Sequence, residues 1–181
     1  MCSTFTAPSR NLRNGPSLLL CVQHPRRSRR TRSGTQRNCG EVRMTYYPSA
    51  LQELIEEFQE VDDKRERLEM VYELAEEIVL LPVDEWNDDT RVRGCQSEAH
   101  VRIEVEEGLV HIVGAADAKL VQGLMGVLSI AIEGLTPAQA LLIPVDFAKE
   151  MGLITSLSPS RSNGFRNMYD KVMNEIRARS E

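Results

Sequence analysis

The stretch RVRGCQSEAH, residues 91–100, contains the most reactive side chain in the regularly patterned part of this sequence, Cys95. Gly94 precedes the cysteine, and Gln96 and Ser97 follow it. Structural cysteines are most often buried among apolar residues, whereas nucleophilic cysteines act as thiolates in accessible, donor-rich surroundings. Glycine also permits backbone conformations that other residues avoid. These neighbours favour a reactive thiol, and a partly buried structural cysteine is the alternative.

The sequence assigns no acid–base partner to this thiol. His100 lies five residues after Cys95 and is expected in a strand, where it could face either the surface or the thiol. A cysteine–histidine hydrolase needs the histidine in contact with the sulfur. His111 is expected in the partner strand, and nothing in the pattern brings either histidine to the sulfur. The pattern therefore gives little support to a protease-like function.

Several other kinds of chemistry are excluded by what the sequence lacks. It has no Walker loop, no GxGxxG motif and no cluster of metal ligands. Cys95 is the only cysteine after residue 43, so the patterned region can form neither an internal disulfide nor a cysteine-rich zinc or iron–sulfur site. The chain is also too short for a pyridoxal-phosphate enzyme. We expect no metal site and no cofactor of its own.

A second polar stretch, LSPSRSNGF at residues 157–165, precedes the last helix of the chain. Residues 156–164 are expected to be a loop, and Ser160 or Ser162 is expected to cap that helix. The functional alternative is an anion site, in which the positive end of the helix and Arg161 stabilise a thiolate or a persulfide. Asp117 is expected to be an ordinary N-cap of the helix that follows it.

Hydrophobic periodicity predicts the elements that must position these residues. Apolar residues at helical spacing predict an antiparallel pair of helices over 49–61 and 63–79. Alternating residues over 99–113 predict a β-hairpin, beside which a short strand at 91–93 could pair. The absence of βαβ units predicts an α+β fold, a small antiparallel sheet covered by helices.

The second half of the chain is predicted to be mainly helical. Residues 117–134 are apolar on nearly all sides and predict a buried central helix, with Gly123 and Gly126 allowing close approach of a neighbour. Lys119 interrupts this apolar stretch, which argues against a membrane span. A capped short helix at 136–141 and an amphipathic last helix follow.

Charge divides the chain into two parts. Residues 1–43 contain nine arginines and one acid, whereas residues 44–181 contain 13 basic and 26 acidic side chains. Residues 44–181 form the predicted domain, and a domain with this excess of acidic side chains is not expected to bind nucleic acid. The first 43 residues have no hydrophobic periodicity and are expected to be a disordered, arginine-rich leader outside the fold.

Two interpretations of the leader stay open, beside a less favoured functional tail. The leader could be translated in error from a start upstream of Met44, because Gly40-Glu41-Val42 can be encoded by a purine-rich GAGGT sequence like a bacterial ribosome-binding site. It could instead be an organelle transit peptide, which is typically rich in arginine and serine and poor in acids. The first interpretation implies the bacterial cytoplasm, and the second a plastid or mitochondrion.

Four motifs follow one another along the chain: GCQSEAH at 94–100, ADAKLVQGL at 116–124, LTPAQAL at 135–141 and LSPSRSNGF at 157–165. Taken together and in this order, they resemble the SufE family of sulfur acceptors. The resemblance extends over about residues 48–180. Three positions depart from the family pattern: Glu98 replaces a common glutamine, His100 stands where an aromatic residue is frequent, and Ala115 replaces a frequent acid.

The resemblance implies a SufE-like fold and a sulfur-transfer function. Cys95 would carry a persulfide received from a cysteine desulfurase. The protein would stimulate that enzyme and pass the sulfur to an iron–sulfur cluster scaffold. Pyridoxal phosphate would be bound to the desulfurase. Gly94, Gln96, Asp117 and Arg161 would support the site or the docking of a partner, and the protein would be a monomer or weak dimer. Two alternatives are a sister acceptor for another desulfurase and pathway, and a non-catalytic desulfurase-binding adaptor.

Overall fold

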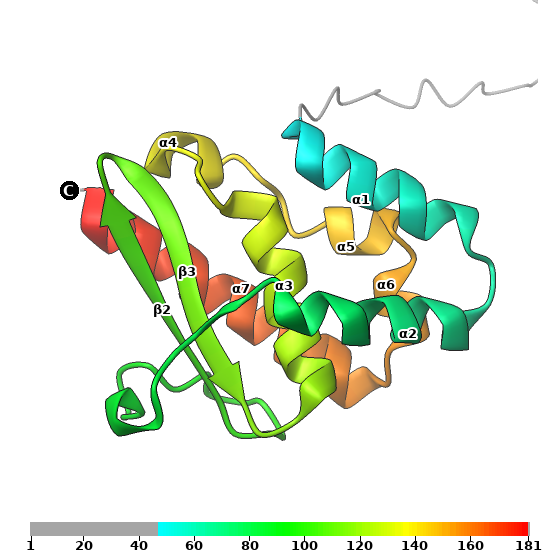
Figure 1. The fold of residues 1–181 in the computed structure, drawn as a ribbon, viewed down its shortest axis with the longest axis horizontal. Coiled ribbons are helices and arrows are strands. Elements are labelled where there is room, and N and C mark those ends of the chain that lie inside the picture. The colour runs from blue at the N-terminus through cyan, green and yellow to red at the C-terminus, as the bar shows by residue number, and fades with distance from the viewer. Residues whose placement is uncertain (1–46, 181) are drawn as a thin grey trace, which may run out of the picture. The chain divides into compact units, whose positions relative to one another are not determined.

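A computed structural model describes residues 47–180, so the leader expected at residues 1–43 lies outside the described residues. Figure 1 shows a small sheet packed against helices. The elements are, in order, α1 (Ser49–Glu60), α2 (Lys64–Glu73), β1 (Val79–Leu80), β2 (Ala99–Glu106), β3 (Leu109–Ala116), α3 (Lys119–Ile132), α4 (Pro137–Ala140), α5 (Phe147–Glu150), α6 (Leu153–Ser156) and α7 (Pro159–Ser180). Short 3₁₀ turns at Leu74–Glu76 and Val83–Glu85 flank β1. The predicted α+β class is confirmed.

The sheet has the strand order β1-β3-β2 and is mixed, not purely antiparallel as predicted. β2 and β3 form the expected antiparallel hairpin, whereas β1 runs parallel to β3. The sequence pattern placed Val79 at the end of the second helix, but α2 stops at Glu73 and Val79 is 63 % exposed. Pairing with β3 supplies the backbone of β1 with hydrogen bonds, so these residues need no helix to satisfy them.

Helix α3 is the centre of the fold and packs between the sheet and helices α1, α2 and α7. Both predicted contact glycines lie where α3 meets the end of α2. A Cβ atom on Gly123 would lie 1.8 Å from the carbonyl oxygen of Val71, and one on Gly126 would lie 1.9 Å from that of Leu74. The close approach is confirmed. The helices α1 and α2 run in opposite directions, as predicted, but each packs mainly against α3 and not against the other.

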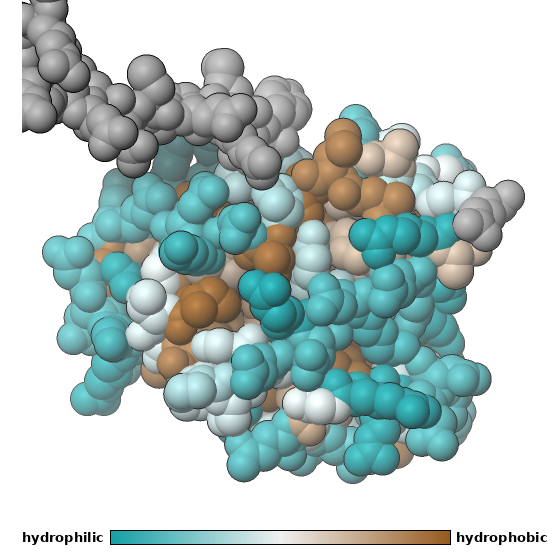
Figure 2. Space-filling view, turned by 180° about the vertical axis from the view of Figure 1, so that it is seen from behind, coloured by the Kyte–Doolittle hydropathy of each residue, from teal (hydrophilic) through white to brown (hydrophobic). Residues whose placement is uncertain are grey.

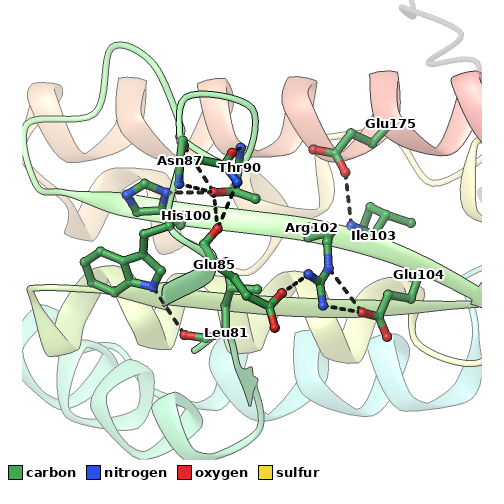
Figure 3. A network of polar contacts seen from close by, with 10 residues as sticks. Leu81, Glu85, Asn87, Thr90, His100, Arg102, Ile103, Glu104 and Glu175 are labelled. Carbon is green, nitrogen blue, oxygen red and sulfur yellow. Dashed lines mark hydrogen bonds and ion pairs between the residues drawn. The ribbon is translucent and has the colours of Figure 1, made fainter. Parts of the chain in front are cut away.

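Helix α7 covers the free edge of β2. Its apolar side is buried in the core, and the carboxylate of Glu175 accepts a hydrogen bond from the backbone N–H of Ile103 at 3.0 Å. Lys171 and Arg179 hold this carboxylate from the same helix at 2.7 and 3.2 Å. Figure 3 shows Glu175 above the strand. An exposed strand edge is a template for unwanted pairing, and here a side chain of α7 occupies part of it.

The segment between β1 and β2 covers the outer face of the sheet. Trp86 stacks on the ring of His100 at a centroid distance of 4.7 Å and donates a hydrogen bond to the carbonyl oxygen of Leu81 at 3.2 Å. Farther along β2, Arg102 forms ion pairs with Glu85 and Glu104 (Figure 3). Trp86 therefore packs on the sheet and joins this segment to β2.

The surface is mostly polar. Figure 2 shows one face covered mainly by hydrophilic residues, with hydrophobic residues reaching it in smaller groups. The most exposed large apolar side chains include Leu142 after α4 and Val83 after β1, at 79 % and 73 % exposure. Across residues 47–180, no helix is both long enough and apolar enough to cross a membrane.

Candidate functional site

Cys95 lies near the tip of a loop that extends from the start of β2. The backbone N–H of Val92 donates to the carbonyl oxygen of Ala99, and that of Val101 donates to Thr90, both at 2.8 Å. A single antiparallel bridge joins Arg91 to His100, which is what remains of the strand predicted at 91–93. These bonds close the base of the loop and leave its tip outside the sheet.

Gly94 fixes the backbone next to the thiol. Its φ angle is +76°, in the left-handed region that favours glycine. A Cβ atom here would also lie 2.5 Å from the side-chain nitrogen of Asn167 on α7. Any other residue would be strained at this φ, and the side chain of Asn167 would have to move, so the unusual backbone predicted for Gly94 is confirmed.

The thiol of Cys95 is partly buried against helices α3 and α7. A small cleft surrounds it, with about 10 Å³ available to the centre of a water-sized sphere. This is room for about one atom of that size. The lining residues are Gln96 and Ser97 from the loop, Val121 and Leu124 from α3, and Ser160, Arg161, Gly164, Phe165 and Met168 from α7. The floor is therefore apolar and the rim polar.

Helix α7 begins earlier than predicted. Pro159 is its first residue, and the N–H of Ser162 donates to the carbonyl oxygen of Ser158 at 2.9 Å. Proline suits the first helical position because its φ is fixed and it has no N–H to satisfy. The expected loop at 156–164 and the expected caps Ser160 and Ser162 are wrong, because most of that stretch is already helical.

Arg161 is brought to the cysteine loop, as the anion-site interpretation requires. It lies in the first turn of α7, and its guanidinium donates a hydrogen bond to the hydroxyl of Ser97 at 3.4 Å. At this distance the bond is weak. Arg161 therefore lines the cleft of Cys95 and makes a light contact with the tip of the loop.

Asp117 lies outside the cleft. The residue at the N-cap of α3 is Ala118, which makes no side-chain cap, so the expected cap at Asp117 is wrong. The side chain of Asp117 is exposed, and its backbone N–H donates to the carbonyl oxygen of Glu98 at 3.0 Å. The residue thus holds the end of the cysteine loop through its backbone.

His100 is a packing residue and does not activate the thiol. It is 3 % exposed, its Nδ1 lies 2.9 Å from the hydroxyl of Thr90, and its ring stacks on Trp86. It is absent from the residues that line the cleft of Cys95. The imidazole therefore serves to stack on Trp86 and to contact Thr90.

Two residues at the site were missed by the sequence analysis, Gly164 and Asn167. Both lie on the side of α7 that faces the loop, Gly164 against the sulfur and Asn167 against Gly94. The sequence signal for Gly164 is its position directly before the apolar side chains of a helix. The prediction of a loop at this stretch hides that signal. Within the described residues, no group of three histidine, cysteine or acidic side chains could hold a metal ion.

The fold and the site define a single-thiol domain of the α+β class, in which a constrained loop holds one cysteine against two helices. The chain belongs to the SufE family: the family model "SufE: Fe-S metabolism associated domain" matches residues 52–176. The predicted resemblance is confirmed, and the protein is thereby associated with iron–sulfur metabolism.

Named relatives agree with this family. A SufE-like protein of Synechocystis, itself uncharacterized, is 33 % identical over 122 residues, covering 67 % of this chain and 77 % of the relative. The chloroplastic/mitochondrial SufE-like protein 1 of Arabidopsis thaliana is also 33 % identical, but the match covers only 33 % of it. The solution structure of a hypothetical protein from Thermus thermophilus is similar with a TM-score of 0.64 at 25 % identity, over 74 % of this chain and 97 % of that one.

Proposed function

We propose that this protein accepts sulfur from a cysteine desulfurase on Cys95, stimulates that enzyme, and passes the sulfur to an iron–sulfur cluster scaffold. The observation that carries the proposal is the position of Cys95, the free cysteine of the described residues, beside a cleft with room for about one further atom. Family membership supplies the metabolic setting.

The sulfur transfer is a thiol–persulfide exchange. The thiolate of Cys95 attacks the outer sulfur of a persulfide on the desulfurase, and a new S–S bond forms as the old one breaks. The cysteine of the desulfurase leaves as a thiolate, and the proton of the persulfide travels with the transferred sulfur. The step requires one thiol and no oxidant, which is consistent with a site that contains a single cysteine.

The surroundings of Cys95 suit both the thiolate and the product. Ser160 and Arg161, from the first turn of α7, line the same cleft as the sulfur, and a helix N-terminus and a guanidinium are both groups that attract anions. The apolar floor, including Phe165 and Met168, keeps water away from the inner side of the sulfur. A persulfide in this position is partly protected from reductants between partners.

Delivery requires the sulfur to leave the cleft, and the contacts of the loop permit this. Backbone hydrogen bonds of 2.8 Å hold the base of the loop, whereas the weak bond from Arg161 to Ser97 holds its tip. A partner that binds the exposed Gln96 side of the loop can therefore pull the tip outward while β2 stays in place. The scaffold would receive the sulfur from the same exposed position.

The replacement Cys95→Ser tests this function. It removes the nucleophile with little change in volume, so the variant is expected to fold normally and to lose stimulation of the desulfurase. Desulfurase turnover with and without added protein is the measurement, and binding of the variant to the enzyme is the control. Full stimulation by Cys95→Ser would make the protein a non-catalytic adaptor.

A further inference from the structure

Gly164 lies at a position where glycine needs an explanation. It is buried inside the long helix α7, and glycine in a helix interior is less favourable than alanine. Its φ angle is not positive, unlike those of Gly94, Gly108, Gly134 and Gly152, so no unusual backbone conformation requires it. The reason must be space.

The space belongs to the sulfur of Cys95. A Cβ atom on Gly164 would lie 3.3 Å from Sγ of Cys95 and 4.0 Å from its Cα, and apart from its own helix it would meet nothing else within 4 Å. The packing glycines of α3 differ, because a Cβ on Gly123 or Gly126 would collide with backbone carbonyls. At Gly164 the sole neighbour is the reactive residue.

The side that would yield to an added methyl group is the cysteine loop. Behind the sulfur, Phe165 and Met168 are fully buried and Leu124 is 1 % exposed, so the floor of the cleft is tightly packed. The tip of the loop, in contrast, is held to α7 through the 3.4 Å bond between Arg161 and Ser97. An overlap between an added Cβ atom and Sγ is relieved by movement of the less tightly packed side. Here that side is the cysteine loop, which would move away from α7.

We propose that Gly164 is a positioning residue that sets how deeply the sulfur of Cys95 rests in the cleft. Its missing side chain leaves room for the thiol, and for the outer sulfur of the persulfide, to stay sheltered while the protein is free. The persulfide part rests on the proposed function, and the position of the thiol does not. Alanine at this position would push the sulfur outward by a few tenths of an ångström and leave it less sheltered.

The replacement Gly164→Ala tests this role, with Asn163→Ala as the matched control. Asn163 is the preceding residue of α7 and is exposed, so its replacement changes the helix without adding an atom to the cleft. The alkylation rate of Cys95 by iodoacetamide, followed on the Cys95 peptide by mass spectrometry, is expected to rise about twofold in Gly164→Ala, which corresponds to about 0.4 kcal/mol. The control is expected to match the unchanged protein.

A second measurement separates this role from general damage to the fold. In a Cys95→Ala background the sulfur is gone, so Gly164→Ala should raise the thermal midpoint because alanine favours helix. In the unchanged background the same replacement should raise the midpoint less or lower it, because the methyl group meets Sγ. This double-mutant cycle isolates the contact between the two residues.

Two results would overturn the inference: an alkylation rate of Gly164→Ala equal to that of Asn163→Ala, or a change in midpoint that is the same with and without the sulfur. Persulfide on Cys95, formed with a desulfurase, is expected to be reduced by dithiothreitol faster in Gly164→Ala than in the control, and equal rates would overturn its sheltering role. If Cys95 accepts no sulfur at all, the proposed function fails, while alkylation and the cycle still decide the position of the thiol.

Discussion

Cys95 owes its position to residues that act from two sides of its loop. Gly94 turns the backbone through a left-handed conformation, and Arg161 and Gly164 meet the loop from α7. The thiol and its preceding glycine could be predicted because their signals are local. Gly164 could not, because its role depends on a contact between segments almost seventy residues apart, which no local pattern reveals.

The incorrect predictions of the helix-capping residues also have a physical cause. Several adjacent polar residues could cap the helices, and the actual choice depends on where each helix begins. Pro159 starts α7 before Ser160 and Ser162, and the N–H of Asp117 is held by Glu98 just before α3 starts. Sequence spacing alone does not distinguish these candidates.

Replacing Arg161 tests its support of the thiolate and of docking. Arg161→Ala should change the free energy of unfolding by no more than about 0.5 kcal/mol, since the residue is partly exposed and its bond to Ser97 is weak. Sulfur acceptance from the desulfurase should fall, and Arg161→Lys should restore only part of it because lysine lacks the planar guanidinium.

The pH dependence of Cys95 alkylation distinguishes the two roles of Arg161. A midpoint displaced to higher pH in Arg161→Ala indicates support of the thiolate, whereas an unchanged midpoint with weaker acceptance indicates docking. If neither alkylation nor desulfurase stimulation changes, Arg161 has no functional role and only the residues around Cys95 itself remain in the site.

At the scale of elements, the packing of α3 against α2 holds the platform on which the cysteine loop rests. The long periodic segments, the hairpin and the central helix could be predicted because their patterns extend over many residues. Strand β1 and the one-turn helices α5 and α6 could not, because two to four residues are too short to show a period. Their conformation is decided by tertiary contacts, chiefly pairing with β3 for β1.

The replacement Gly126→Ala tests this packing. The added Cβ would lie 1.9 Å from the carbonyl oxygen of Leu74, so α2 and α3 must separate. We expect the free energy of unfolding, measured by urea denaturation, to fall by about 3 kcal/mol, the upper range for overpacked cores. This loss outweighs the better helix propensity of alanine, which is worth about 1 kcal/mol.

An exposed position at the start of the same helix provides the control. Lys119→Ala should change the free energy of unfolding by less than about 0.5 kcal/mol because its side chain makes no buried contact. A Gly126→Ala variant as stable as Lys119→Ala would show that the close approach of α2 and α3 is not required.

At the scale of the molecule, one domain contains both the core and the site. The buried hydrophobic residues of the described part extend from Tyr47 to Ile176, and the family match covers 52–176. The sheet and the packed helices form the frame, and the tip of the cysteine loop is held to it by weaker contacts than the base of the loop. Such a division suits a carrier that must shelter a reactive group and then present it.

The arginine-rich residues 1–43 are predicted to be dispensable for this domain. A variant that begins at Met44 should have the same thermal midpoint as the full chain and should stimulate a desulfurase equally, because the leader sequence offers no apolar stripe to bury. A lower midpoint or weaker stimulation would show that the leader takes part in folding or docking. The N-terminal residue of the native protein, determined by mass spectrometry, would distinguish a start at Met44 from a cleaved transit peptide.

The most direct test of sulfur acceptance is to find the transferred sulfur on the chain. The full-length protein is incubated with a cysteine desulfurase and cysteine, alkylated to trap persulfides, digested and analysed by mass spectrometry. We expect the mass of one added sulfur atom on the peptide that contains Cys95, and no comparable addition on the peptides of Cys2, Cys21 and Cys39. Sulfur found mainly on one of those three cysteines, or no sulfur on Cys95 while the desulfurase is active, would contradict the function proposed here.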